Sequence, residues 1–234
     1  MKVCTFRINE ICPGKHNLKD PRLDHAHTLV EAKKKVHAQI ETVEEKDLSV
    51  SEAILVRRAN VEDLILKDLE LIDARLGRDP DETEQASLIR LYAELESGKT
   101  VREATLDEAD RTTLSIHSFV TDRPIIVVTE EDLVAADELL LRVYREAGYI
   151  SFLTVGGSEN RAWKIRQGTS AWEAAGVVHS DMQRGFIRAE IISYEDFVAA
   201  GGETEAKREG KQRLERKTYI IQDYDLVNFR FNKS

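Results

Sequence analysis

The sequence predicts an α/β fold in two parts, an α/β layer over residues 1–148 and a β-grasp (ubiquitin-like) domain over residues 149–234. Up to Gly148, short β-branched runs alternate with amphipathic segments, which is typical of a parallel sheet covered by helices. After Gly148 the order becomes strand, strand, helix, strand, strand, which is the plan of a β-grasp domain. This change of pattern sets the predicted boundary between the two parts.

Strands of the first part are predicted from alternating apolar and polar residues and from short apolar runs. They are expected at Met1–Ile8, Val36–Val43, Glu52–Arg57 and Pro124–Thr129. The last of these, PIIVVT, is a continuous β-branched run and predicts a parallel strand that is buried on both faces. A loop punctuated by proline and glycine, NEICPGKHNLKDPRLD, separates the first two strands.

An acidic helical hairpin is expected at residues 60–98. Asn60 can cap its first helix, and Asp79 can cap its second, with Pro80 at the first helical position. Between residues 61 and 110 the chain has fifteen Asp and Glu residues against six Lys and Arg. This segment dominates the net charge of −9, and its surface should repel nucleic-acid phosphate.

Two further helices complete the first part. A capping box at Thr105 and Glu108 begins one, and Glu131–Ala147 forms the other. In the second part, strands are expected at Ile150–Val155, Ala162–Ile165, Ile187–Ser193, Tyr219–Ile221 and Leu226–Phe231. Short helices are expected at Ala171–Ala175 and Tyr194–Ala199.

The composition is that of a soluble globular protein, since 41% of the 234 residues are hydrophobic and 33% are charged. No run of about eighteen apolar residues occurs, so no membrane span is expected, and the charged N-terminus is unlike a signal peptide. Two cysteines, Cys4 and Cys12, make no disulfide framework, which indicates a reduced, cytoplasmic protein. The spacing of cysteine and histidine matches no zinc pattern, so no metal site is expected.

Five short motifs lie in the last third of the chain: RAW, AAG, HxD, GFIRAE and FxFN, the first beginning at Arg161 and the last ending at Asn232. Together they closely resemble the C-terminal TGS domain of the YchF / Obg-like ATPases, which are cytosolic P-loop proteins of the translation-factor type. The resemblance identifies as family-motif residues Arg161, Trp163, His179, Asp181, Gly185, Phe186 and Arg188.

The first part resembles the same family only in fragments, such as DPRLD at Asp20–Asp24. The resemblance implies an abridged P-loop-NTPase-like parallel sheet that carries the helical hairpin. A P-loop needs GxxxxGK[ST], because glycine amides cradle the phosphates and the hydroxyl binds magnesium. Here Gly14-Lys15 is followed by His16, and the first glycine of the motif is absent.

Two other nucleotide motifs of the family are also incomplete. The DxxG position reads Glu44–Asp47 and has no glycine, and Thr129-Glu130 stands where the base-recognition asparagine is expected. Catalytic residues and a bound ATP or GTP cofactor are therefore not expected. The remaining nucleotide-binding candidates, all weak, are Gly14, Lys15 and Glu131.

Lys207–Lys217 (KREGKQRLERK) is the one basic cluster in an acidic chain, with six basic and two acidic residues. It is either a solvated surface or a contact for RNA phosphates, and the family resemblance favours ribosomal or transfer RNA. The RNA-binding candidates are Lys207, Arg208, Lys211, Arg213, Arg216 and Lys217.

Other side chains have two interpretations. His179 and Asp181 either form an Asx-type turn, in which Asp181 accepts backbone amides, or contact a ligand. Trp163 and Trp172 are expected to be partly buried, and the alternative is an exposed platform for a stacked base.

The sequence thus predicts a regulatory module that binds the ribosome or structured RNA and hydrolyses no nucleotide. One alternative is an Obg-like protein that keeps residual affinity for ATP or GTP. Another is a scaffold that contacts a protein partner through the helical hairpin. The oligomeric state does not follow from the sequence.

Overall fold

The structure, a computed structural model, describes residues 1–232 and confirms the mixed α/β fold class. The chain forms two compact units. The first consists of Met1–Lys15 and Glu41–Leu139, and the second of His16–Ile40 and the chain from Leu140 onward. This division differs from the predicted boundary at residue 148, because two segments that precede it pack within the second unit.

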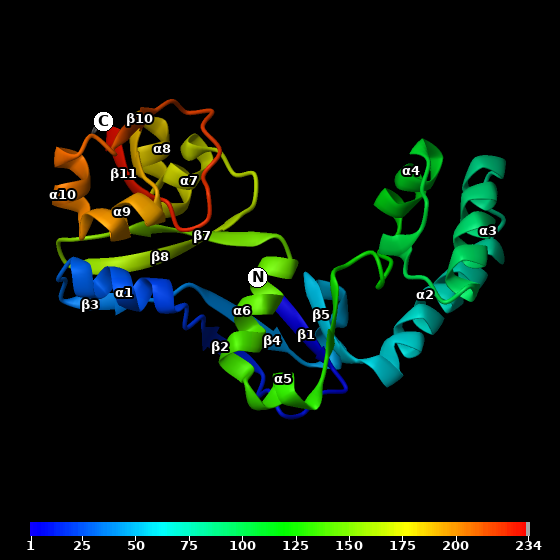
Figure 1. The fold of residues 1–234 in the computed structure, drawn as a ribbon. Coiled ribbons are helices and arrows are strands. Elements are labelled where there is room, and N and C mark those ends of the chain that lie inside the picture. Colours follow the sequence, from blue (N-terminus) through cyan, green and yellow to red (C-terminus); the bar gives the residue numbers. More distant parts are fainter. Residues whose placement is uncertain (233–234) are drawn as a thin grey trace. The chain divides into compact units, whose positions relative to one another are not determined.

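The first unit is built on a five-stranded sheet in the order β2-β4-β1-β5-β6 (Figure 1). β1 pairs in parallel with β4 and β5, and β5 pairs in parallel with β6. The expectation that the last strand is buried on both faces is wrong, because β6 is an edge strand and Val127 is 37% exposed. The strands are β1 (Lys2–Phe6), β2 (Gly14–Asn17), β4 (Gln39–Val43), β5 (Ala53–Arg57) and β6 (Ile125–Val128).

Helices of the first unit form the expected hairpin, α2 (Val61–Leu76) and α3 (Glu82–Glu96), with α4 (Glu108–Ile116) beside it. Its core is made of aliphatic side chains at helical spacing, such as Leu88, Leu91 and Leu95. The shorter elements are α5 (Glu130–Val134) and the 3₁₀ turns η1 (Glu45–Val50), η2 (Arg58–Asn60) and η3 (Val101–Glu103).

The helix starts differ from the predicted caps. Asn60 precedes α2 without a side-chain cap hydrogen bond. Asp81 caps α3 by accepting from Glu84 N, whereas Asp79 lies before the helix with a φ of 53°. Asp107, two residues after the predicted Thr105, caps α4.

The second unit contains a six-stranded sheet in the order β10-β9-β11-β7-β8-β3 (Figure 1). Its first five strands have the strand order of a β-grasp sheet, with β11 central, parallel to β7 and antiparallel to β9. β3 extends the sheet by pairing in parallel with β8. The strands are β3 (Lys34–Val36), β7 (Tyr149–Thr154), β8 (Glu159–Arg166), β9 (Phe186–Ile192), β10 (Arg213–Glu215) and β11 (Leu226–Phe231).

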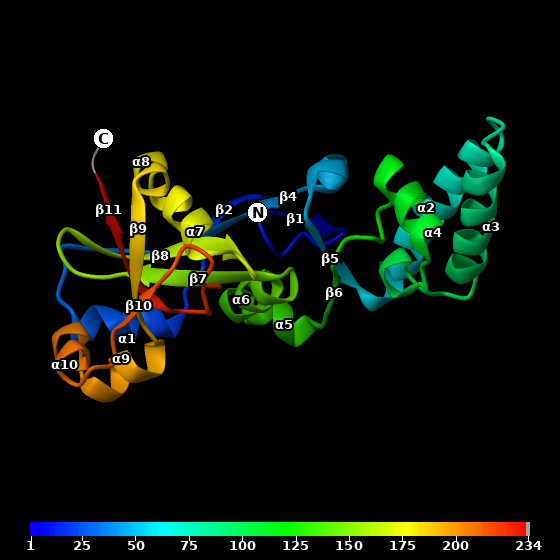
Figure 2. The same ribbon diagram turned by 90° about the horizontal axis from the view of Figure 1, so that it is seen from above.

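Helices cover both faces of this sheet: α7 and α8 lie on one side, and α1, α9 and α10 on the other (Figures 1 and 2). Alanines of α7 pack on Phe152, Val227 and Phe229 in the core between that helix and the sheet. The helices are α1 (Pro21–Leu29), α6 (Ala136–Glu146), α7 (Ala171–Val178), α8 (Ser180–Arg184), α9 (Tyr194–Ala200) and α10 (Glu203–Arg208).

A buried charge network explains why the DPRLD segment belongs to the second unit. Asp20 is 4% exposed and caps α1. Its carboxylate lies 2.8 Å from Arg22 Nη2 and 3.1 Å from Arg145 Nη2, and Arg22 also pairs with Asp223 at 2.8 Å. Burial would raise the pKa of Asp20, but the hydrogen bonds from Arg22 outweigh it and keep the pKa below its usual value. The Arg22 guanidinium stacks 3.7 Å from the ring centroid of Tyr224.

Three predicted elements need correction. The strand expected at Val36–Val43 is two strands, β3 and β4, in different sheets. The helix expected at Glu131–Ala147 is broken at Ala135, where ψ is 51°, into α5 and α6. The strand expected at Tyr219–Ile221 is only an isolated bridge between Ile220 and Ser170, and β10 precedes it at Arg213–Glu215.

Candidate nucleic-acid interface

The nucleotide-binding candidates lie at opposite edges of the first sheet. Gly14 and Lys15 are in β2, at one edge, and Glu131 is in α5, which follows β6 at the other. Three strands lie between β2 and β6, so the structure does not bring these residues together. β1 leads through a loop into strand β2 and not into a helix, so no helix N-terminus follows β1 to bind phosphate.

Charges at the carboxyl ends of these parallel strands are neutralised by one another. This edge is where open α/β sheets bind ligands. Arg57, at the end of β5, pairs with Glu10 at 2.6 Å and with Glu130 at 3.0 Å. The hydrogen bond from Arg57 lowers the pKa of Glu10, which keeps this carboxylate ionised. A nearby arginine, Arg7, pairs with Asp63 at 2.6 Å.

A hollow of about 460 Å³ lies beside the end of β1. Its charged lining residues are Arg7, Glu44 and Glu45. All three are paired: Arg7 with Asp63, Glu44 with Lys46 at 2.7 Å and Glu45 with Lys67 at 3.5 Å. The lining therefore offers no unpaired cation to a nucleotide phosphate.

Two family-motif residues in the second unit have roles in packing. Asn232 N donates to the carbonyl oxygen of Gly185 at 2.9 Å, and a Cβ at Gly185 would lie 2.2 Å from the carbonyl oxygen of Asn232. Only glycine allows this close approach, which joins the GFIRAE and FxFN motifs. The rings of Phe186 and Phe229 lie 6.2 Å apart, centroid to centroid, at the same place.

Other motif residues are fixed by local contacts. The Arg161 guanidinium lies 4.1 Å from the ring centroid of Trp163, which is half-buried and donates from Nε1 to Thr154 Oγ1 at 2.9 Å. His179 caps α8, since its Nδ1 accepts from Asp181 N at 3.1 Å. The roles expected in the Asx-type turn are thus exchanged, because His179 accepts the amide and the Asp181 carboxylate pairs with Arg184.

The basic cluster divides into paired and unpaired cations. All six candidate side chains are exposed. Four of them form ion pairs within the second unit: Lys207 with Glu203 at 2.6 Å, Arg208 with Glu205 at 3.7 Å, Lys211 with Asp196 at 3.2 Å and Arg213 with Glu215 at 3.5 Å. Arg216 and Lys217 make no ion pair within residues 1–232.

These two unpaired residues begin a tight turn over Arg216–Tyr219, which we call the basic turn. Tyr219 N donates to Arg216 O at 3.0 Å and closes the turn. Two amides at the start of α7 hold the turn in place: Ala171 N donates to Tyr219 O at 2.7 Å, and Trp172 N donates to Lys217 O at 3.2 Å. The turn therefore satisfies helix-start amides that would otherwise have no partner.

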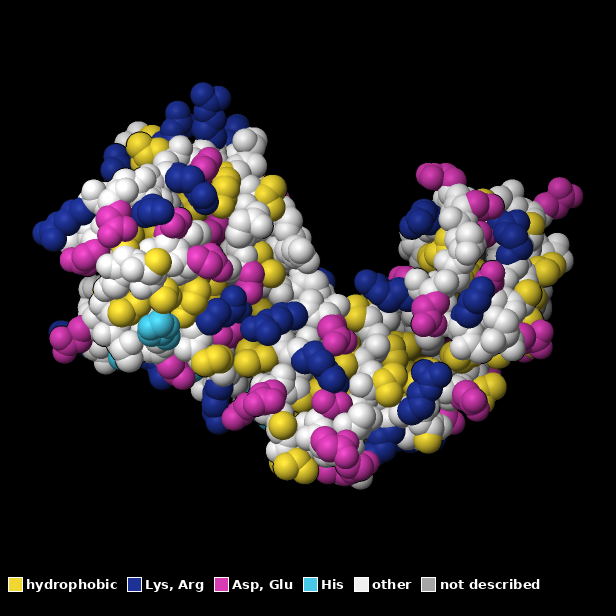
Figure 3. Space-filling model, viewed as in Figure 1, with side chains coloured by type: hydrophobic (Ala, Val, Ile, Leu, Met, Phe, Trp, Pro, Cys, Tyr) yellow, Lys and Arg dark blue, Asp and Glu magenta, His cyan; other side chains and the backbone are white. Residues whose placement is uncertain are grey.

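A third cation, the family-motif residue Arg188, is placed beside the basic turn. Ala189 of β9 pairs with Glu215 of β10, so Arg188 lies across from Arg216, the residue that follows β10. Arg188 is exposed and makes no ion pair within the described residues 1–232. Lys and Arg side chains gather above β10 at the upper left of Figure 3. The second unit thus presents three unpaired cations at one end of the β9–β10 pair.

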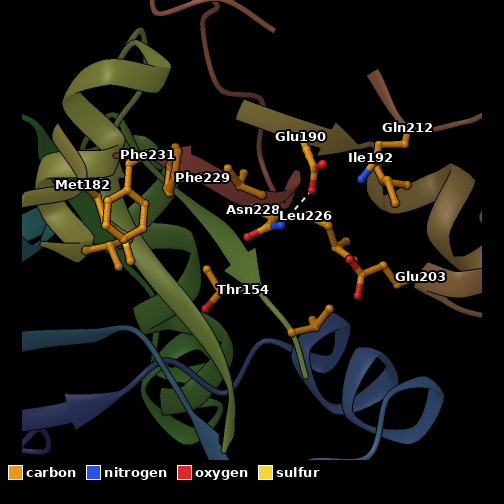
Figure 4. A pocket seen from close by; sticks show the side chains of 13 residues that line it. Thr154, Met182, Glu190, Ile192, Glu203, Gln212, Leu226, Asn228, Phe229 and Phe231 are labelled. Atoms are coloured by element: carbon orange, nitrogen blue, oxygen red, sulfur yellow. Dashed lines mark hydrogen bonds between the residues drawn. The ribbon is translucent and has the colours of Figure 1, made fainter. Parts of the chain in front are cut away.

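A second hollow, of about 460 Å³, is lined mainly by side chains of β9, β11, α8 and α10 (Figure 4). Glu190 in its wall is 6% exposed and accepts from Asn228 Nδ2 at 2.7 Å and Arg230 Nε at 2.6 Å. Burial would raise the pKa of Glu190, but these two hydrogen bonds outweigh it and lower the pKa. The two acids in its lining are therefore both paired, Glu190 with Arg230 and Glu203 with Lys207.

Sequence reasoning placed Trp172 partly in the core, but it is 45% exposed. The signal that could have shown this is the periodicity of α7, whose buried residues Ala171, Ala174 and Ala175 form one stripe. Trp172 is outside that stripe.

Within residues 1–232, no helix is long and apolar enough to cross a membrane, and no cluster of His, Cys, Asp or Glu is arranged to hold a metal ion.

Comparison with known proteins identifies the family. The family model YchF-GTPase_C, described as "Protein of unknown function (DUF933)", matches residues 149–232. The ribosome-binding ATPase YchF of Bacillus subtilis (strain 168) is 38% identical over 154 residues, 66% of this chain and 41% of that protein. The Obg-like ATPase 1 of Gallus gallus is 46% identical over 92 residues, 37% of this chain and 23% of that protein.

Two solved structures share the fold. The Schizosaccharomyces pombe YchF GTPase matches with a TM-score of 0.79 at 16% identity, over 98% of this chain and 97% of that chain. The GTP binding protein from Pyrococcus horikoshii OT3 matches with a TM-score of 0.52 at 13% identity, over 99% of both chains. At these identities the likeness shows the fold alone.

The part of the chain at residues 149–232 belongs to the YchF family, as the motifs predicted. The chain spans less than half the length of the curated relatives it matches, at 41% of the Bacillus protein and 23% of the Gallus protein.

Proposed function

We propose that this chain is a cytoplasmic regulatory module that binds the ribosome or structured RNA through its second unit and hydrolyses no nucleotide. In this proposal the second unit acts as a TGS domain. The observation that carries the proposal is the group of three unpaired, exposed cations, Arg188, Arg216 and Lys217, at one end of the β9–β10 pair. The names of the Bacillus and Haemophilus influenzae relatives, ribosome-binding ATPase YchF, support the choice of partner.

Electrostatics favour this surface for phosphate. A cation that is already paired must give up its partner before it binds phosphate, whereas an unpaired cation only releases water and ions. Arg216 and Lys217 are also held on a turn whose backbone is fixed by hydrogen bonds to α7, so little ordering is needed on binding.

The claim that no nucleotide is hydrolysed rests on the first sheet. Lys15 is in an edge strand, and Arg57 is engaged by Glu10 and Glu130 at the carboxyl edge. Phosphoryl transfer depends on positioned cations and magnesium ligands around the phosphates. The hollow at the end of β1 offers neither a glycine-rich loop nor an unpaired basic side chain among its lining residues.

Co-sedimentation with ribosomes tests the proposed partner. Binding should weaken steeply between about 50 and 200 mM salt, because neutralised phosphates release condensed counterions. The double variant Arg216→Glu, Lys217→Glu should lose at least about tenfold in affinity. Lys33→Glu, Lys34→Glu is the matched control, since it reverses two exposed lysines of the same unit. Equal loss in both variants, or binding that is insensitive to salt, would contradict the proposal.

The scaffold alternative also has an observation in its favour. Leu66 of α2 and Ile89 of α3 are 53% and 54% exposed, which leaves apolar surface on the hairpin. If Leu66→Ser and Ile89→Ser abolish recruitment to ribosomes while the charge reversal has no effect, the scaffold function replaces the RNA-binding one. Titration with labelled ATP and GTP tests the remaining alternative of residual nucleotide affinity.

A further inference from the structure

We infer that Trp172 is a stacking platform for one unpaired RNA base, whose flanking phosphates contact Arg216 and Lys217. This inference rests on the proposed function and names the chemistry of its ligand, a single-stranded segment of RNA. Its basis is the juxtaposition of an exposed indole with the basic turn.

Trp172 and the basic turn are held side by side by the backbone. The amide of Trp172 donates to the carbonyl oxygen of Lys217 at 3.2 Å, and the next contact along the turn joins Ala171 N to Tyr219 O at 2.7 Å. Further along, Ile220 bridges Ser170. The backbone positions that carry the indole and the two cations are therefore fixed relative to one another, which favours recognition of one nucleotide.

The indole is available for contact. Trp172 is 45% exposed, and its ring takes part in no ring–ring or cation–π contact within residues 1–232. The neighbouring Ile220 is 43% exposed and adds apolar surface. Trp163, by contrast, is half-buried, with Arg161 over its face and Thr154 bonded to its Nε1. The two tryptophans thus have different roles, one in packing and one at the surface.

Charge around Trp172 favours a nucleic acid over an acidic or neutral peptide. Arg216 and Lys217 are exposed and without an ion pair within residues 1–232, and Arg188 lies across from Arg216. The nearest acid in sequence, Glu173, is engaged in the helix cap, where it accepts from Ser170 N at 2.9 Å and Ser170 Oγ at 2.7 Å. An aromatic face next to cations is the arrangement by which proteins bind single strands, since the ring stacks on the base and the cations contact the backbone.

Fluorescence anisotropy of three end-labelled 12-nucleotide RNA probes, titrated with the full chain, tests this inference. The probes are oligoadenylate, an abasic ribose-phosphate oligomer of the same length and a self-complementary duplex. The wild-type chain should bind oligoadenylate about tenfold more tightly than the abasic oligomer, because one stacked base contributes on the order of tenfold or more. Trp172→Ala should remove that preference without changing affinity for the abasic oligomer, and Trp172→Phe should keep most of it.

The outcomes separate this inference from the proposed function. If Trp172→Ala keeps the preference for oligoadenylate while Arg216→Ala, Lys217→Ala weakens binding of every probe, the stacking platform is refuted and RNA binding stands. If neither change affects any probe, both are refuted. If Trp172→Ala weakens ribosome binding but not oligoadenylate binding, a protein surface contacts the indole and the inference is overturned.

Discussion

Two arginines, Arg57 of the first unit and Arg216 of the second, differ in whether they have an acidic partner. At the carboxyl edge of the first sheet, Arg57 lies between Glu10 and Glu130, at 2.6 Å and 3.0 Å, and its charge is used within the fold. At the basic turn of the second unit, Arg216 is exposed and has no ion pair within residues 1–232. A count of basic residues would treat the two alike. We expect the capacity of each cation to bind phosphate to depend on whether it already has a carboxylate partner.

The largest expected effect is a complete absence of turnover by the first unit. Purified protein should release no phosphate from ATP or GTP above background, with or without magnesium, because β1 leads into strand β2 without a glycine-rich loop and helix to hold the phosphates, and Arg57 is engaged by Glu10 and Glu130. A malachite-green assay measures the release. Magnesium-dependent turnover that Lys15→Ala abolishes would show that the edge strand β2 holds a working site, and the contrast between the two units would fail.

The second effect is on stability and concerns the buried carboxylate of Asp20, which pairs with two partly exposed arginines. Asp20→Asn should lower the free energy of unfolding by about 3 kcal/mol, because it leaves Arg22 and Arg145 without their buried carboxylate. Urea denaturation of wild type and variant measures the difference. The exposed Asp24, which pairs with Lys35, is the control, and Asp24→Asn should cost less than about 1 kcal/mol.

The pH dependence of the stability that Asp20 contributes follows from its pKa, which is lowered in the folded protein. A lowered folded pKa means that the carboxylate stabilises the fold above its unfolded pKa of about 3.9, and that this contribution is lost as pH falls through the folded pKa. The difference in the free energy of unfolding between wild type and Asp20→Asn should therefore be constant near neutral pH and shrink below about pH 4. A difference that grows on acidification would contradict the assigned network.

The smallest effect on stability is expected when the unpaired cations are replaced. Arg216→Ala with Lys217→Ala should change the free energy of unfolding by less than about 0.5 kcal/mol, because exposed side chains without partners contribute little to folding. Thermal unfolding measures this. A loss of more than about 1 kcal/mol would mean that these side chains support the fold, and it would weaken their assignment as a binding surface.

The sequence predicted much of the fold because most of the information used is local. Most of the motif GFIRAE and of the run PIIVVT lies in strands β9 and β6, and the hairpin α2–α3 forms where it was expected. What could not be predicted depends on contacts between distant positions. Arg22 meets Asp223 across 201 positions, which is why the segment at 16–40 joins the second unit.

The sequence allows only some of the ion pairs in the basic cluster to be predicted. Lys207 lies four residues after Glu203, and Arg208 lies three after Glu205, so helical spacing predicts both pairs. The partner of Lys211 is Asp196, on a different helix, and its pairing needs the tertiary structure. The same applies to the position of Arg188 across from Arg216, which follows from the register of β9 and β10.

The salt dependence of RNA binding tests the central claim most directly. Affinity for ribosomal RNA is measured over a range of salt concentrations for the wild type, for Arg216→Ala, Lys217→Ala and for Lys207→Ala, Arg208→Ala, which removes the same charge. We predict that the first variant loses about two units from the slope of log affinity against log salt, because two phosphate contacts are lost, and that the second loses less than about one. Equal losses in the two variants, or a larger loss in the second, would contradict the account.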